Sequence, residues 1–488
     1  MSATGEGIMF KVEREIPNRI APTENLFLRG MFAPTSREIT ADNLQVEGEI
    51  PRDLFGIYLR NGPNPIFQPR DRYHWFDGDG MIHAIEFREG RATYRNRWIT
   101  TEGFLAEQQA QRAIWPGLMD KPDRYVPRGA GSDGWLKDTA NTDLIFHNGY
   151  ALALWYQCGV PYKIEARTLQ TLGIENFRGA LKRTVSAHAK VDPVTGELLF
   201  FDYSTKPPLM TYNVVSASGE LKHHIPIEVP GPRLPHDMAF TPHYSVLMDL
   251  PLFWDPDLLA RGIHKVSYFP HLPSRFAIVP RYGDAGEVRW FETSPCYIYH
   301  VVNAWEDGDE IVMDACRVIG PEPKSARGEG ELARMRAFLR LEAELYRWRF
   351  NLATGVAREE RLDDQRTEWP TIHRGKMGRR TRYAYSSLVP HFEGLVKYDL
   401  ERNTSERYLF GPGRAANECP FAPRLGAADE DDGYLVAFVS DANGGDQGEV
   451  VILNAKDIAA GPIGRLKIPQ RVPVGFHALW IPGEQLPA

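Results

Sequence analysis

The chain has few cysteines and no long hydrophobic run. Its four cysteines, Cys158, Cys296, Cys316 and Cys419, are scattered through 488 residues without CxxC spacing, so we expect a reducing compartment and no disulfide framework. No stretch of about 18 consecutive apolar residues could form a membrane-spanning helix. Residues 1–20 lack the basic and apolar segments of a signal peptide. We therefore predict a cytoplasmic protein whose only membrane contact would be peripheral.

The chain also lacks a large net charge of either sign. The chain has 57 Lys and Arg against 64 Asp and Glu, a formal net charge of −7, so we expect no nucleic-acid partner. Hydrophobic residues make up 43% and charged residues 25%, a composition that excludes a disordered or collagen-like chain. The length would suit about three domains, but one large all-β domain fits it equally well.

Runs of β-branched and aromatic residues alternate with tight glycine-containing turns, a pattern that predicts β-hairpins. The predicted hairpins span 144–156, 189–203, 211–225, 301–318, 346–362 and 429–441. Hairpins spread over so much chain favour a β-propeller over a sandwich. Helical periodicity is limited to 100–115, 256–262 and 330–345, which we expect to leave the blades and cap one end.

Two segments match known motifs in sequence but lack the structural context or the ligands that those motifs require. Gly129, Gly131 and Gly134 match GxGxxG, but no strong strand precedes them and no helix follows, so dinucleotide binding is not predicted. A calcium loop beginning at Asp77 would end at Arg88, where that loop needs a bidentate glutamate, so we read the segment as a tight turn.

Four of the fourteen histidines lie in or beside strand-like runs: His188, His236, His300 and His477. They are too far apart along the chain for a zinc finger, so a shared site requires three-dimensional convergence. The innermost strands of a propeller face one axis and would supply it. Imidazole suits iron, zinc, copper and nickel alike, so the residue type leaves the metal open.

Metal-binding histidines usually hydrogen-bond a carboxylate through their second ring nitrogen. Glu368 and Glu418 are the candidates, because both lie next to proline and apolar residues, where an unpartnered carboxylate would be costly.

Eight segments together resemble the carotenoid cleavage oxygenase family. They are LRNGPNP (59–65), YHWFDGDGMIHA (73–84), NTDLIFHNG (141–149), AHAKVDPVTGEL (187–198), PHDMAFT (235–241), HVVNAWEDGDE (300–310), EDDGYLVAFV (430–439) and RVPVGFHALW (471–480). The resemblance extends from about residue 24 to residue 482 and includes all four histidines. It implies an all-β fold, a seven-bladed β-propeller with a helical and loop cap, formed by 24–488 after an N-terminal extension, 1–23.

The resemblance also implies the site. One non-haem Fe(II) per chain would be held by His188, His236, His300 and His477, with Glu368 and Glu418 as two of three glutamates behind them. Thr142 matches a threonine that limits access to an open iron position.

The third glutamate position departs from the family pattern. Where the family commonly has Leu-Trp-Glu, this chain reads Leu154, Trp155, Tyr156, Gln157. One histidine is therefore expected to lack its usual carboxylate, with Tyr156 or Gln157 as a weaker acceptor or with the loop remodelled.

The family reaction adds O2 across a conjugated C=C bond and yields two aldehydes or ketones. The segments LFLRGMFAP and PCYIYHVVNAWEDGDEIV resemble the carotenoid and apocarotenoid branch, which we favour. The alternative substrate is a stilbene or phenylpropenoid, because Lys137 falls on the lysine with which lignostilbene dioxygenases grip a phenol. The matching aromatic position holds Phe104, which has no hydroxyl, and Lys137 would otherwise be a solvated loop lysine.

Two other functions remain compatible with the sequence: an isomerase-hydrolase with the same fold and ligands, and a propeller that only binds partners. A hydrophobic alkene substrate would favour a nonpolar patch near a tunnel mouth that touches membranes. Aromatic residues near the histidines would suit an apolar tunnel: Trp75, Phe76, Trp155, Tyr299 and Phe476.

Overall fold

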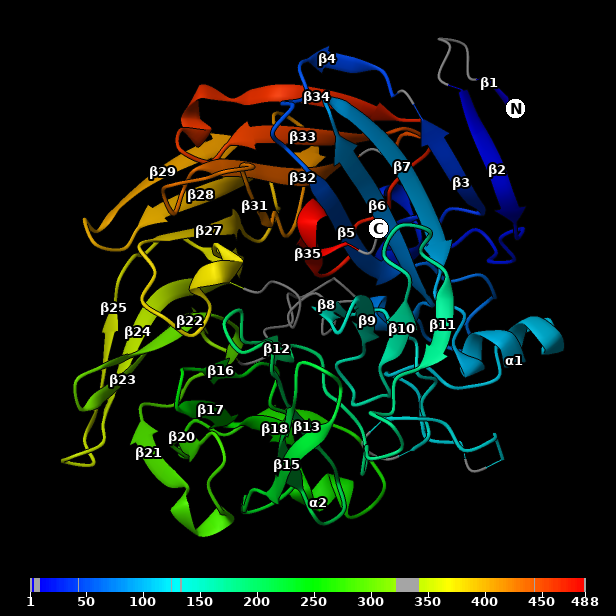
Figure 1. Cartoon of the computed structure of the whole chain (residues 1–488). Helices are drawn as coiled ribbons and strands as arrows, with labels where there is room; N and C mark the ends of the chain where they lie inside the picture. The colour runs from blue at the N-terminus through cyan, green and yellow to red at the C-terminus, as the bar shows by residue number, and fades with distance from the viewer. Residues whose placement is uncertain are drawn as a thin grey trace.

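Seven β-sheets form a ring around a central axis. The computed structural model describes residues 2–3, 9–42, 44–123, 125–131, 134–321, 342–442 and 444–486. In Figure 1 the sheets follow one another in chain order, from blue through cyan, green and yellow to red. The predicted seven-bladed β-propeller is confirmed.

Each blade of the first three begins at the axis with its innermost strand and extends outward. Blade one contains β35 (Ala478–Pro482), β5 (Gly56–Pro63), β6 (Gly80–Arg88), β7 (Arg91–Trp98), β3 (Arg37–Asp42), β2 (Met9–Glu15) and β1 (Ser2–Ala3). Blade two contains β8 (Asp143–His147), β9 (Tyr150–Leu154), β10 (Tyr162–Ile164) and β11 (Thr171–Ile174). Blade three contains β12 (Lys190–Val191), β13 (Leu198–Tyr203), β14 (Met210–Val215) and β15 (Leu221–Pro226).

The remaining four blades repeat this meander. Blade four contains β16 (Ala239–Phe240), β17 (Tyr244–Asp249), β20 (Ser274–Pro280) and β21 (Arg289–Thr293). Blade five contains β22 (Ile298–Asp307), β23 (Glu310–Val318), β24 (Ala343–Asn351) and β25 (Ala357–Arg361). Blade six contains β26 (Thr367–Thr371), β27 (Tyr383–Leu388), β28 (Gly394–Asp399) and β29 (Thr404–Leu409). Blade seven contains β30 (Arg414–Ala415), β31 (Phe421–Pro423), β32 (Gly433–Asp441), β33 (Gly448–Asn454), β34 (Pro462–Ile468) and β4 (Val46–Gly48).

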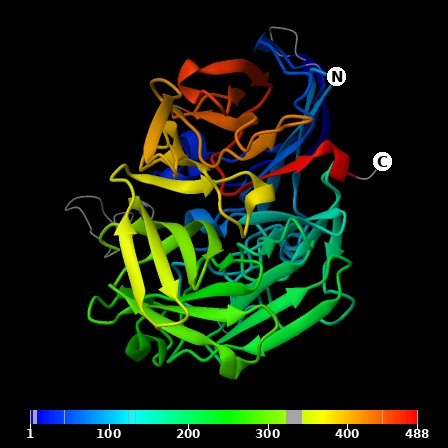
Figure 2. The ribbon, with the colours of Figure 1, turned by 60° about the vertical axis from the view of Figure 1, so that its left-hand side comes forward.

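Both ends of the chain close the ring. β35, near the C-terminus, pairs with β5 and becomes the innermost strand of blade one, which Figure 2 shows as a red strand beside the blue sheet. β4, near the N-terminus, pairs with β34 on the outer edge of blade seven. β2 pairs with β3, so this part of the predicted N-terminal extension is an outer strand of blade one.

The strands form where the residue pattern matches their position in a blade. Middle strands such as β13 and β14 are mostly apolar and are buried at every residue, because neighbouring blades cover both of their faces. Outer strands such as β29 read as polar and are largely exposed. Five predicted hairpins are confirmed as strand pairs, whereas 429–441 holds one strand, β32, after a turn.

Two predicted helices are present outside the blades. α1 (Glu102–Ala110) begins after Thr101, whose hydroxyl accepts the N–H of Phe104. α2 (Pro256–Leu259) begins after Asp255 and lies between β18 (Leu252–Trp254) and β19 (Val266–Tyr268), which pair with each other. No helix in the described ranges is long and apolar enough to cross a membrane.

The third predicted helix, 330–345, is partly wrong. Residues 330–341 lie outside the described residues, but Ala343 already belongs to β24 and pairs with Val318 on β23. Most side chains along β24 alternate between buried and partly exposed, as in a strand. Pairing with the edge of β23 therefore outweighs the helical propensity of this segment.

Candidate metal centre

The four histidines meet on the axis of the ring. His188, His236 and His477 precede the innermost strands β12, β16 and β35 by one to three positions, and His300 lies within β22. One nitrogen from each histidine lies within 4.8 Å of the others. The ring centroids of His188 and His477 are 4.4 Å apart, and those of His300 and His477 are 4.7 Å apart.

The donor set fits a divalent transition metal. Nε2 of His188 and Nε2 of His300 are buried and have no hydrogen-bond partner in the described chain. Buried polar atoms without partners are costly, and a cation that accepts their lone pairs removes that cost. Four neutral imidazoles suit Fe(II) among other metals.

Glu368 and Glu418 lie behind two of these histidines. Oε2 of Glu368, on β26, hydrogen-bonds Nδ1 of His300 and accepts the N–H of Trp369 at 2.7 Å. Oε2 of Glu418 lies 3.4 Å from Nδ1 of His477 and accepts the N–H of Ala478. Each contact at Nδ1 leaves Nε2 of the same ring available to a metal.

Burial favours the neutral form of two of the four histidines. It holds the pKa of His300 and the pKa of His236 well below the usual range, and the neighbouring histidines act in the same direction. Burial also lowers the pKa of His477, but Glu418 and other nearby carboxylates outweigh it, so that this pKa is raised. A low pKa favours the neutral imidazole, which is the form that binds a metal.

Asp143 supplies a third carboxylate that the sequence analysis missed. Oδ2 of Asp143, at the start of β8, lies 3.3 Å from Nδ1 of His188 and accepts the His188 N–H at 3.1 Å. Although burial raises the pKa of Asp143, the hydrogen bond and charge of His188 outweigh it and lower that pKa. The available signal was an aspartate opening the otherwise apolar run DLIF, next to Thr142.

Tyr156 and Gln157 occupy the remodelled loop after β9. The ring of Tyr156 lies 6.1 Å from the ring of His236, and Gln157 is buried beside it. Among the described residues, no carboxylate pairs with His236, which lies between the rings of Tyr156 and Tyr299. In the described part of the chain, His236 is thus the histidine without a carboxylate partner that the sequence analysis expected.

A cavity of about 2030 Å³ opens from the histidines toward β18, α2 and β19. His236, His300, His477 and Thr142 line it. The hydroxyl of Thr142 donates to Oδ1 of Asn141 at 3.0 Å. Four of the five aromatic residues expected in a tunnel line this cavity, namely Trp75, Phe76, Tyr299 and Phe476, whereas Trp155 lines a smaller pocket beside it.

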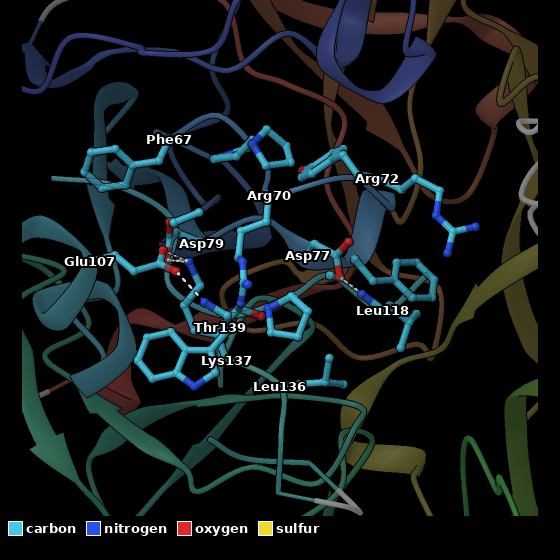
Figure 3. A pocket seen from close by; sticks show the side chains of 18 of the residues that line it. Phe67, Arg70, Arg72, Asp77, Asp79, Glu107, Leu118, Leu136, Lys137 and Thr139 are labelled. Carbon is cyan, nitrogen blue, oxygen red and sulfur yellow. Dashed lines mark hydrogen bonds and ion pairs between the residues drawn. The ribbon is translucent and has the colours of Figure 1, made fainter. Parts of the chain in front are cut away.

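Lys137 lies in that smaller pocket, which Figure 3 shows. Its ammonium lies 2.9 Å from Oδ1 of Asp79 and 2.6 Å from Oε2 of Glu107. Burial lowers the pKa of Lys137, but the two carboxylates outweigh it and raise that pKa. Lys137 is therefore not a solvated loop lysine, and Asp79, in the segment read as a tight turn, is buried and pairs with it.

Phe104 lines neither cavity. It is 1% exposed, on α1, and packs among Ile66, Phe67, Met81 and Trp98. Neither pocket includes it in its lining, so this structure places Phe104 in the hydrophobic core.

Comparisons with known proteins agree with this architecture. The family model of the retinal pigment epithelial membrane protein matches residues 32–482. A carotenoid 9,10(9′,10′)-cleavage dioxygenase from Crocus sativus is 36% identical, over 94% of this chain and 90% of that protein. An isoeugenol monooxygenase from Pseudomonas nitroreducens is 31% identical, over 93% of this chain and 98% of that protein.

Solved structures show the same fold. Lignostilbene dioxygenase of Pseudomonas brassicacearum superposes with a TM-score of 0.84 and 29% identity, covering 96% of this chain and all of that one. The cobalt-substituted apocarotenoid oxygenase of Synechocystis gives a TM-score of 0.82 and 28% identity, covering 95% and 100%. The chain therefore belongs to the retinal pigment epithelial membrane protein family of carotenoid-cleavage-type oxygenases.

Proposed function

We propose that this protein is a non-haem Fe(II) dioxygenase that cleaves a conjugated C=C bond of a carotenoid or apocarotenoid. The observation that carries the proposal is the convergence of four histidine nitrogens at one end of a large cavity lined by aromatic side chains. Bound Fe(II) would activate O2, which the side chains cannot do alone. The C=C bond breaks and each carbon receives one oxygen atom, so no external reductant is consumed.

The size of the cavity favours a long substrate. Ordinary small-molecule pockets have volumes of about 300–1,000 Å³, and this cavity is at least twice as large. Its aromatic walls bury a polyene and exclude water without offering an acid or base beside the histidines. Both properties suit a carotenoid or apocarotenoid better than a single phenylpropenoid.

Cleavage of a stilbene or phenylpropenoid is the second candidate function. The relatives include a lignostilbene dioxygenase and an isoeugenol monooxygenase. In addition, the pocket of Lys137 adjoins the main cavity, since Phe76, Tyr156 and Gln157 line both. The ion pairs of Lys137 with Asp79 and Glu107 weigh against it, because a phenol would have to compete with two carboxylates.

The test is metal analysis followed by an aerobic assay of the Fe(II)-loaded protein on β-carotene, an apocarotenal and a hydroxystilbene, in ¹⁸O2. We expect one iron per chain and a shortened polyene in which each new carbonyl carries one labelled oxygen. Cleavage of the stilbene alone would favour the second candidate. A product without label would indicate an isomerase-hydrolase, and protein that binds no iron would overturn the proposal.

A further inference from the structure

Two residues near the metal centre, Tyr156 and Asp143, bear on where its third carboxylate lies. Tyr156 occupies the place of the family's third glutamate and lies beside His236. Asp143, thirteen positions earlier by residue number, brings a carboxylate to His188 instead. Both side chains belong to blade two or to the loop that follows β9, so one blade carries both changes.

We propose that Asp143 is the third positioning carboxylate of this metal centre, moved from behind His236 to behind His188. The inference rests on the proposed metal site. Three histidines, His188, His300 and His477, then each have one carboxylate at Nδ1. The number of carboxyl groups behind the ligands equals that of a three-glutamate set.

The contacts of Asp143 suit a positioning role. Its Oδ2 faces both the main-chain N–H and the ring Nδ1 of His188, while Oδ1 accepts the N–H of Leu144 at 2.7 Å. His188 has a φ of +64°, a left-handed conformation that a non-glycine residue adopts only when its surroundings enforce it. Asp143 therefore holds the backbone and the ring of the same ligand.

The exchange also changes the cavity wall. Tyr156 lines the cavity, and its ring packs edge-on against Phe76 with centroids 4.9 Å apart. A glutamate there would place a negative charge on the wall that faces the substrate. With Tyr156 at that position, the wall beside His236 is aromatic, while Asp143 keeps the third charge on the protein side of His188.

The test is a double-mutant cycle read by Co(II) binding to the apoprotein, followed by visible absorption of the bound ion, with no substrate present. We expect Asp143→Asn to weaken Co(II) binding about 10–100-fold and to change the spectrum, because carboxylates behind metal ligands contribute about that much affinity. We expect Tyr156→Glu to recover most of this loss in the Asp143→Asn background. The two substitutions should therefore be strongly coupled.

Asp138→Asn is the matched control. Asp138 is a buried carboxylate five positions earlier that accepts the N–H groups of Ala140 and Val160 and contacts none of the four histidines. It should leave Co(II) affinity unchanged. Melting temperatures of the apoproteins show whether each variant folds. If Asp143→Asn alone does not fold, the Co(II) affinity of Tyr156→Glu can still be compared with that of the double variant, and the difference measures the contribution of Asp143.

The outcomes separate this inference from the proposed function. If the unmodified protein binds no Co(II), the metal site itself is wrong. If it binds Co(II) and Asp143→Asn binds equally well with the same spectrum, the role of Asp143 is wrong. If Tyr156→Glu recovers nothing, the exchange of positions is wrong.

Discussion

The buried carboxyl group of Asp138 makes the stability of the protein depend on pH. Burial raises its pKa to about 6 from the ordinary 3.8, although the N–H groups of Ala140 and Val160 stabilise the ionised form. Between these two pH values the folded protein keeps a proton that the unfolded chain releases. This carboxyl group therefore makes the protein less stable as pH rises from about 4 to about 6, by on the order of 3 kcal/mol.

Asp138→Asn should remove that dependence. We expect the melting temperature of the variant, relative to the unmodified protein, to increase from pH 4 to pH 6 and then to level off, since the amide does not titrate. Thermal unfolding followed by circular dichroism across this range provides the measurement. Parallel curves for the two proteins would show that Asp138 is ionised with an ordinary pKa.

The sequence could identify the four histidines but not all of their partners. His188, His236, His300 and His477 each stand in a recognisable segment, and they converge because each precedes or joins an innermost strand. Asp143 could not be found in this way, since its role depends on β8 and β12 lying side by side on the axis. For the same reason, the sequence could not show that Asp79 and Glu107 surround Lys137.

At the scale of elements, the hairpin pattern predicted the blades because strand pairs are local in sequence. The ring closures were not predictable in that way, since β4 and β35 pair with strands from the opposite end of the chain. The segment 330–345 was misread at its end because Ala343 and its neighbours carry helix-forming residues, while the edge of β23 requires a strand there.

The segment before β35 has almost no spare room. A Cβ atom on Gly475 would lie 2.5 Å from the carbonyl oxygen of Asn61 and 2.8 Å from Nε of Arg60. The same stretch of backbone pairs with Asn61, which accepts the N–H of Phe476 and donates to the carbonyl of His477. Crowding at Gly475 is therefore transmitted to His477, two positions later.

Gly475→Ala should lower both stability and metal retention. Overpacking of this kind costs about 1–3 kcal/mol, and the displaced backbone carries a metal ligand. Melting temperature and iron content after dialysis are the readouts. Gly286→Ala is the control, because a Cβ atom there has no neighbour within 4 Å. Equal iron retention in the two variants would mean that the segment shifts without moving His477.

At the scale of the whole molecule, the charge is unevenly placed. The chain has a net charge of −7, yet the outer part of the cavity is lined by exposed Lys121, Arg128, Lys206, Arg261 and Lys265. Ile263 lines the same region and is 49% exposed. We call these residues the cationic mouth. Its positive charge and its apolar side chain suit binding to an anionic membrane surface, from which a hydrophobic substrate could be extracted.

We expect the protein to co-sediment with vesicles containing phosphatidylglycerol and to be released by salt. Each Lys or Arg near an anionic surface contributes about 1 kcal/mol, so Lys121→Gln combined with Lys265→Gln should weaken binding at least tenfold. Ile263→Ser should weaken it without changing its salt dependence. Failure to sediment at every salt concentration would count against the membrane contact.

The double closure of the ring sets the order in which a newly made chain can mature. Blade one contains β5 from the start of the propeller and β35 from its end, and His477 directly precedes β35. Until β35 has been synthesised, the inner edge of the first blade has no partner and the fourth histidine of the cluster is missing. A chain that stops before His477 therefore has an open blade one and an incomplete histidine cluster.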